Sequence, residues 1–106
     1  MIYAKPGSEG SVVSFKESYG NFINGEWVAP VKGEYFTATS PVDGSDIAQI
    51  PRSTSEDIEL ALDAAHAAKK GWADKSVAER SNILLKIADR IEENLELLAV
   101  AETWDN

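Results

Sequence analysis

Apolar side chains recur every three or four positions along the last third of the chain, between Ser76 and Asn106. This spacing places them on one side of an α-helix. The apolar stripe consists of Leu84, Ile87, Ala88, Ile91, Leu95 and Leu98. The charged residues that occupy the remaining directions of the helix, Arg80 among them, are expected to face water. The pattern therefore predicts a long amphipathic helix.

The beginning and the break of this helical stretch carry local signals. Ser76 and Glu79 have the spacing of a capping box, in which each side chain accepts a hydrogen bond from the backbone N–H of the other residue. The stretch is about twice as long as a mean helix of roughly 11–12 residues. We therefore expect a break near Glu93–Asn94, with the asparagine in the left-handed conformation, and a second helix from Leu95 towards Trp104. Because the chain stops within this pattern, we expect it to be part of a longer protein.

A first, shorter helix is predicted from Thr54 to about Trp72. Thr54 and Asp57 have the spacing of an N-terminal cap, and an acidic side chain suits the positive end of the helix dipole. The side expected to be buried contains Ile58, Ala61, Leu62, Ala65, Ala68 and Trp72. So many alanines on one side predict close approach to another backbone.

Two strand pairs are expected before the helices. The first is a tight hairpin within Tyr19–Val28, because the Asn24–Gly25 pair tolerates the positive φ angles of a type I′ turn. The second pairs Tyr35–Ser40 with Asp46–Ile50, and Pro51 is expected to end it since proline has no N–H for the ladder. Two-stranded hairpins are marginally stable alone, so both pairs need a packing partner.

The order of these elements defines the expected fold class. Residues 1–18 show no regular period and are interpreted as a mobile N-terminal arm. Residues 19–106 follow as a β-hairpin, a second strand pair and two to three helices, which together make an α+β fragment. A length of 106 residues corresponds to one domain at most.

Composition excludes several classes of function. The formal net charge of −8 repels phosphate groups, which disfavours nucleic acid and anionic membranes as partners. No apolar run has the length of a membrane span or the form of a signal peptide, so the cytoplasm is the expected location. The chain has no cysteine, which removes disulfides, thiolate metal sites and a cysteine nucleophile from these residues.

Few residues point to chemistry. His66 is the only histidine, and it shares a helix side with charged neighbours such as Asp63 and Lys70, so a solvated surface position is favoured over a catalytic one. No glycine-rich phosphate loop is present. We therefore assign no catalytic and no cofactor-binding residue to this chain.

Acidic pairs and tryptophans have simple structural interpretations. The acidic pairs, which lack the spacing of a calcium loop, are Glu56–Asp57, Glu92–Glu93 and Asp43 with Asp46. They are expected at helix starts and on solvated surfaces. The large aromatic anchors are Trp27, Trp72 and Trp104. Packing in a core or an interface is favoured for them over ligand stacking.

Four segments, taken together, carry a family resemblance. They are FINGEW at residues 22–27, SPVDG at 40–44, the alanine-rich helix at 58–72, and the stretch from AER at 78–80 to the ending ETWDN. In this order and at these separations, they resemble the N-terminal part of the NAD(P)-dependent aldehyde dehydrogenase family. The ETWDN ending and the Ala-Ala-His run look most similar to the bacterial acetaldehyde dehydrogenases.

The resemblance implies that residues 19–106 are an incomplete, N-terminal part of the cofactor-binding domain in an α/β aldehyde dehydrogenase fold. It implies oxidation of aldehydes to carboxylic acids with NAD(P), through a cysteine nucleophile and a glutamate base that lie outside this chain. The segment alone is then inactive and binds no cofactor. The family also tends to hold a structural cation, which by position corresponds to a backbone carbonyl near Thr39 and to Asp105.

Two functional interpretations follow. In the first, the chain is part of an aldehyde dehydrogenase, its partners being the remainder of the same enzyme and further copies in a homo-oligomer. In the second, it is a self-sufficient, acidic α+β module that binds a protein through its exposed helices. Under the first, the apolar helix sides lack their partners here, and the chain alone is expected to be unstable or to self-associate.

Overall fold

The computed structural model of the protein describes residues 3–106. Within them, strands come first in the chain and helices last, as the α+β prediction requires. The strands are β1 (Asn21–Ile23), β2 (Glu26–Val28), β3 (Tyr35–Thr39) and β4 (Asp46–Pro51). The helices are α1 (Ser55–Ala73), α2 (Val77–Glu93) and α3 (Leu95–Asp105).

Strands β1 and β2 form the predicted tight hairpin. They pair in antiparallel fashion, with Phe22 opposite Trp27, and the two ring centroids lie 5.0 Å apart. Asn24 and Gly25 have φ angles of 54° and 80°, so the positive-φ turn is confirmed.

Strands β3 and β4 form the second antiparallel pair, with a register shift between Ala38 and Thr39. The predicted end of β4 is wrong by one residue, because the strand extends to Pro51. Proline lacks an N–H, yet the ladder continues past it: the N–H of Arg52 donates to the carbonyl oxygen of Glu34 at 2.8 Å. Pro51 therefore occupies the last position of the strand rather than the first position beyond it.

Both long helices begin where the capping signals predict. At α1, the N–H of Thr54 donates to Asp57 Oδ2 at 2.8 Å. At α2, the N–H of Glu79 donates to Ser76 Oγ at 3.1 Å, and the N–H of Ser76 donates to Glu79 Oε2 at 2.9 Å. These contacts satisfy backbone donors that have no partner within the first helical turn.

The break between α2 and α3 falls at Asn94 as predicted, but its backbone geometry was predicted wrongly. Asn94 has φ −114° and ψ 19°, outside the left-handed region. Its side-chain Nδ2 donates to the carbonyl oxygen of Arg90 at 2.8 Å. The side chain thus satisfies a carbonyl at the end of α2, and no left-handed residue is needed to stop the helix.

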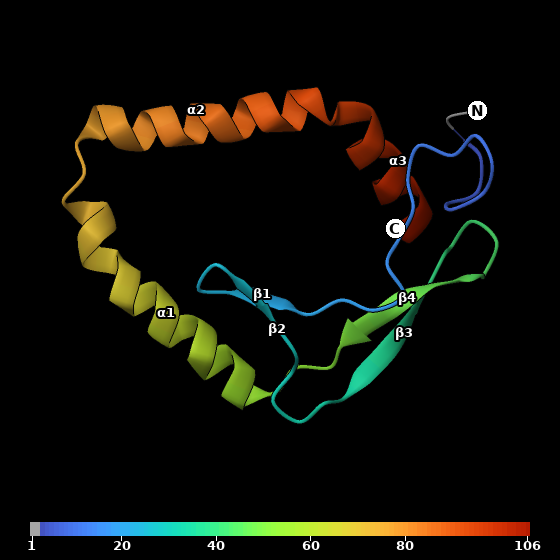
Figure 1. Ribbon diagram of the computed structural model, residues 1–106, viewed down its shortest axis with the longest axis horizontal. Coiled ribbons are helices and arrows are strands. Elements are labelled where there is room, and N and C mark those ends of the chain that lie inside the picture. The colour runs from blue at the N-terminus through green and yellow to red at the C-terminus, as the bar shows by residue number, and fades with distance from the viewer. Residues whose placement is uncertain (1–2) are drawn as a thin grey trace.

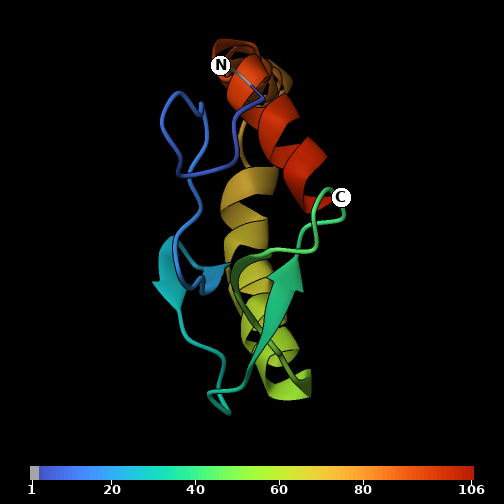
Figure 2. The ribbon, with the colours of Figure 1, turned by 90° about the vertical axis from the view of Figure 1, so that its right-hand side faces the viewer.

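The helices form an open arrangement rather than a layer over the strands. Figure 1 shows α1 on one side, α2 across the top and α3 returning towards the strands, and Figure 2 shows how thin this arrangement is from the side. The radius of gyration is 17.3 Å, whereas about 13 Å is expected of a compact domain of this length. The accessible surface is 7952 Å², against roughly 5,800 Å² for a compact protein of this mass. The chain therefore does not close around a core of ordinary size.

A few buried side chains take the place of a larger core. The buried apolar residues of the described part are Val13, Ala48 and Val100. Along α1, the alanines Ala61, Ala64, Ala65 and Ala68 line a shallow hollow together with residues 22–25 of the hairpin. Hairpin residues thus lie opposite these alanines, but Ala65 and Ala68 are exposed, so the predicted close approach does not extend along the whole row.

The larger apolar residues of the helices are not buried, which corrects the expected packing. On α1, Ile58, Leu62 and Trp72 are exposed. On α2 the exposed fractions are 61% for Leu84 and 51% for Ile87. Amphipathic spacing was recognised correctly, but residues 3–106 leave these large apolar side chains exposed.

The segment that precedes β1 makes specific contacts with β4. The N–H of Gln49 donates to the carbonyl oxygen of Glu17 at 2.9 Å, and the N–H of Tyr19 donates to the carbonyl oxygen of Gln49 at 3.0 Å. Val13 is buried, with 7% of its surface exposed. These contacts attach the segment to the second strand pair, while its mobility stays a prediction.

Candidate functional site

The junction between β3 and α3 brings the two predicted cation ligands into neighbouring segments. Ser40, which is 3% exposed, donates from Oγ to the carbonyl oxygen of Trp104 at 2.6 Å. Thr39 precedes the first of these residues and Asp105 follows the second. Carbonyl and carboxylate oxygens are the ligands that hard cations prefer. Among residues 3–106 no group of three or more acidic or histidine side chains gathers around a common point, so backbone oxygens would have to complete such a site.

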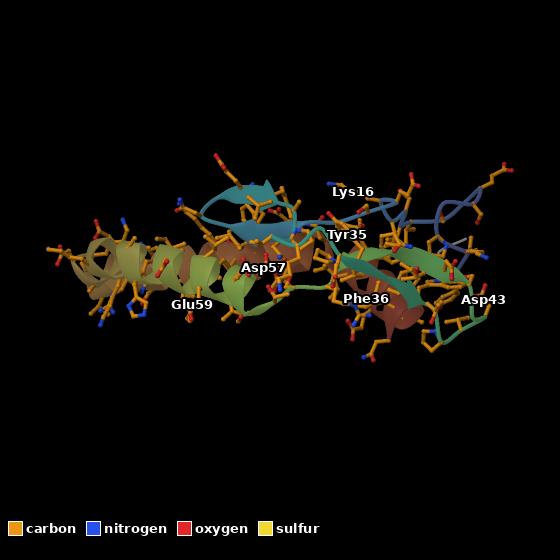
Figure 3. All side chains as sticks on the ribbon, turned by 90° about the horizontal axis from the view of Figure 1, so that it is seen from below. Lys16, Tyr35, Phe36, Asp43, Asp57 and Glu59 are labelled. Carbon is orange, nitrogen blue, oxygen red and sulfur yellow. The ribbon has the colours of Figure 1, made fainter. Side chains whose placement is uncertain are left out.

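Asp57 is a buried carboxylate at the start of α1, with 3% of its surface exposed. Its Oδ2 accepts from the N–H of Thr54 and its Oδ1 from the N–H of Val31, each at 2.8 Å. These two N–H groups, Thr54 first and then Val31, hold the pKa of the Asp57 carboxyl below its usual value. Figure 3 shows Asp57 where α1 meets the strands. Its oxygens are thus occupied in joining the loop before β3 to α1.

Asp43 lies in the turn between β3 and β4, at the end of the molecule away from α1 (Figure 3). The hydroxyl and the N–H of Ser45 both donate to Oδ1 of Asp43, at 2.6 and 2.9 Å. These donors lower the pKa of Asp43, and Lys5 adds an ion pair at 3.4 Å. Asp43 and Asp46 are both exposed, as the solvated interpretation predicted, and Asp43 in addition supports the turn.

The lone histidine occupies the solvated position that its spacing predicts. His66 is exposed on α1, beside Leu62, Ala65 and Lys69. Within the described residues no nucleophile or carboxylate is hydrogen-bonded to it. The structure therefore offers no triad or dyad around His66.

The tryptophans do not form a core in this chain. Trp27 is 64% exposed and Trp72 is 41% exposed, so core packing is wrong for both. Trp104 is half-buried, and its carbonyl oxygen accepts the hydrogen bond from Ser40. Packing in an interface stays a prediction for Trp27 and Trp72.

An apolar groove runs along α2 and onto α3. Its volume is about 470 Å³. The apolar residues that line it are Ile83, Ile87, Ile91, Leu97 and Leu98. Lys86 and Arg90 stand beside it. An open, apolar surface of this kind is suited to packing against another protein segment rather than to catalysis.

Sequence reasoning missed three features of these surfaces. The bonds from Val31 to Asp57 and from Ser40 to Trp104 join residues far apart in the sequence, so no local spacing signals them. Arg80, expected to face water, is half-buried instead. A signal for Arg80 was present, since it lies four residues before Leu84 on the apolar stripe.

No helix within residues 3–106 combines the length and the apolar character needed to cross a bilayer.

Comparison with known proteins identifies the class. The family model described as the aldehyde dehydrogenase family matches residues 27–106. The chain belongs to the aldehyde dehydrogenase family, and the resemblance noted in the sequence is confirmed. An acetaldehyde dehydrogenase of Pseudomonas aeruginosa is 72% identical to it over 106 residues, which are 100% of this chain and 21% of that protein.

Solved structures show the same backbone arrangement within much longer chains. PnpE in complex with nicotinamide adenine dinucleotide matches with a TM-score of 0.79 at 41% identity, over 81% of this chain and 18% of PnpE. An aldehyde dehydrogenase from Bacillus cereus matches with a TM-score of 0.80 at 38% identity, over 85% of this chain and 19% of that one. The chain thus spans about a fifth of the length of the relatives it matches. These findings support the enzyme interpretation and not the self-sufficient interaction module.

Proposed function

We propose that this chain is the N-terminal portion of an enzyme that oxidises aldehydes to carboxylic acids with NAD(P), and that it is inactive by itself. The observation that supports this most is the 72% identity to an acetaldehyde dehydrogenase over the whole chain. The structural likeness to PnpE, which was solved with nicotinamide adenine dinucleotide, supports the cofactor class.

The residues present indicate which roles this chain has in such an enzyme and which roles belong to other parts of the polypeptide. NAD(P), when bound, accepts the hydride that leaves the aldehyde carbon. The chain contains no cysteine, so the thiolate nucleophile has to come from another part of the polypeptide. Residues 19–106 would then support the cofactor-binding domain with their hairpins and helices, and residues 1–18 would form an arm.

Homo-oligomerisation and a cytoplasmic location belong to the same proposal. Large apolar side chains remain exposed on both strand pairs as well as on the helices, Phe22 and Trp27 among them. Surfaces of this kind are typical of interfaces. The net charge of −8 keeps nucleic acid an improbable partner on electrostatic grounds.

A structural cation between Thr39 and Asp105 is a further part of the proposal. The Ser40–Trp104 hydrogen bond supports it, because it holds the segments that carry both ligands together. Its test is the unfolding temperature of the purified protein with sodium, magnesium or calcium, compared between wild type and Asp105→Asn. The wild type should be stabilised by one of these cations and Asp105→Asn should not. The site would be contradicted if a cation raised the unfolding temperature of wild type and Asp105→Asn equally. It would also be contradicted if the control Asp89→Asn lost the stabilisation as Asp105→Asn does.

The mass and activity of the native gene product test the main proposal. An antibody raised against this segment should detect a species several times heavier than 11.5 kDa. That species, once purified, should reduce NAD or NADP when an aldehyde is added, as followed by the absorbance of the reduced nicotinamide. A native product of 11.5 kDa, or a heavier one without aldehyde-dependent reduction, would contradict the proposal.

A further inference from the structure

A single buried donor on α2 has no partner. The Nε atom of Arg80 is buried and makes no hydrogen bond within the described residues. Buried polar groups of native proteins are nearly always paired, and a guanidinium is costly to desolvate without an acceptor. The Nε–H group of Arg80 therefore has no acceptor among residues 3–106.

The neighbours of Arg80 on its own helix explain why it stays unpaired. Residues three and four positions away along a helix lie on the same side. For Arg80 these are Ser76, Val77, Ile83 and Leu84, and none of them is acidic. Arg90, by contrast, pairs with Glu93 at 3.2 Å, and its side chain is 81% exposed. The two arginines of α2 thus differ: Arg90 is exposed and paired, whereas Arg80 is half-buried and its Nε has no partner.

Arg80 also continues the line of the apolar groove. Ile83 and Ile87, which line the groove, lie three and seven residues after it and share its side of the helix. The groove extends from there to Leu97 on α3. One continuous surface therefore presents apolar side chains along its length and a guanidinium at its N-terminal end.

The chain lengths of the relatives indicate what covers this surface. The same arrangement of strands and helices occurs in chains of which this segment is about a fifth. The chain exposes roughly 2,000 Å² more surface than a compact protein of its mass. In the full-length polypeptide the remaining segments are covalently attached, so they reach the groove at a much higher effective concentration than a second copy does.

We propose that the groove along α2 and α3 receives an apolar segment of the same enzyme polypeptide, outside residues 1–106, and that a carboxylate on this segment pairs with Arg80. This inference rests on the proposed function. An apolar occupant matches the isoleucines and leucines of the groove. A carboxylate matches the fork of donors of a guanidinium, with which it forms two parallel hydrogen bonds.

Cross-linking identifies the partner directly. In the native enzyme carrying Arg80→Lys, a zero-length carbodiimide should join the new amine to an aspartate or glutamate outside residues 1–106 of the same polypeptide, as read by peptide mass spectrometry. Arg90→Lys is the matched control and should join to Glu93, its partner in the same helix. Mixed isotope labelling separates links within one polypeptide from links between copies. Links of Arg80→Lys only within residues 1–106, only between copies, or none at all would overturn the proposal.

Unfolding equilibria give an independent measure. Removing one partner of a buried ion pair leaves the other charge unpaired. Arg80→Ala should therefore shift the equilibrium from the native towards the unfolded enzyme by about a hundredfold or more. Lys70→Ala, on α1 and outside the groove, removes an exposed pair with Asp74 and should change it by less than about tenfold. Equal effects of the two substitutions would overturn the pairing.

Aldehyde oxidation by the wild type, measured in parallel, separates this inference from the proposed function. Turnover by the wild type together with equal effects of Arg80→Ala and Lys70→Ala overturns the pairing alone. Absence of turnover contradicts the proposed function, whereas the cross-link of Arg80→Lys still decides the pairing.

Discussion

Ser40 and Trp104 are 64 residues apart in the sequence, yet the hydroxyl of Ser40 donates to the carbonyl oxygen of Trp104 at 2.6 Å. This bond joins the end of β3 to the last turn of α3. It therefore attaches the last helix to the strands, where α3 returns to them in Figure 1. Helix ends leave carbonyl groups without intrahelical partners, and Ser40 satisfies one of them. The contact links the second strand pair to the last helix through a single buried side chain.

Ser40→Ala should destabilise the protein by about 1–3 kcal/mol, since it leaves the carbonyl of Trp104 without its buried donor. Chemical denaturation of the purified native enzyme that carries this chain measures the change. Ser81→Ala, on the exposed surface of α2, is the control and should have little effect. If both substitutions cost the same, the hydrogen bond does not contribute to stability.

Two glycines should respond to alanine in opposite directions. Gly25→Ala places a Cβ on a residue with φ 80° in the hairpin turn and should cost about 1–2 kcal/mol. Gly71→Ala lies in α1 with open space around its Cβ and should stabilise the protein by about 0.5–1 kcal/mol. Thermal unfolding of the two variants tests this pair. A loss of stability for Gly71→Ala would show that its position needs the freedom of glycine.

Acid should destabilise the protein partly through Asp57. The pKa of this carboxyl is lowered in the folded chain, so its contribution to stability is present above its unfolded pKa of about 3.9 and is lost as the pH falls through the folded value. Asp57→Asn should lower the free energy of unfolding at neutral pH. The further loss of stability below about pH 4 should be smaller in this variant than in the wild type. The measurement is the denaturation midpoint as a function of pH.

The control for this pH series is Asp63→Asn, on an exposed part of the same helix. Its pH profile should resemble that of the wild type. Asp43 and Glu79, whose pKa values are also lowered, contribute in the same direction and leave part of the acid sensitivity in place in Asp57→Asn. An Asp57→Asn profile identical in shape to the wild type would contradict the role of this carboxylate.

The 106-residue chain, produced by itself, should be unstable or self-associate because its apolar helix sides are exposed. Light scattering should then report masses above 11.5 kDa. Ile87→Glu combined with Ile91→Glu should reduce the association, since each places a charge on the apolar stripe. Val42→Glu, on an exposed turn away from α2, should leave it unchanged. A compact monomer that unfolds cooperatively would refute this expectation.

Elements that depend on near neighbours were determined by the sequence alone. The Asn24–Gly25 turn follows from the tolerance of these residues for positive φ, and the start of α2 follows from the reciprocal bonds of Ser76 and Glu79. The family was also recognisable, because its segments combine such local signals in a fixed order. Amphipathic spacing showed which side of α2 is apolar, since helical geometry alone decides that.

Contacts between distant residues were decided by the tertiary structure. Asp57 reaches Val31 across 26 residues, and Ser40 reaches Trp104 across 64, so neither partner was evident from local spacing. The conformation of Asn94 depended on a side-chain bond that competed with the left-handed cap. Whether an apolar side is buried depends on what other segments lie against it, and for α2 no segment within residues 3–106 does. Local spacing determines where a surface lies on its element, and only the packing of distant segments determines what covers it.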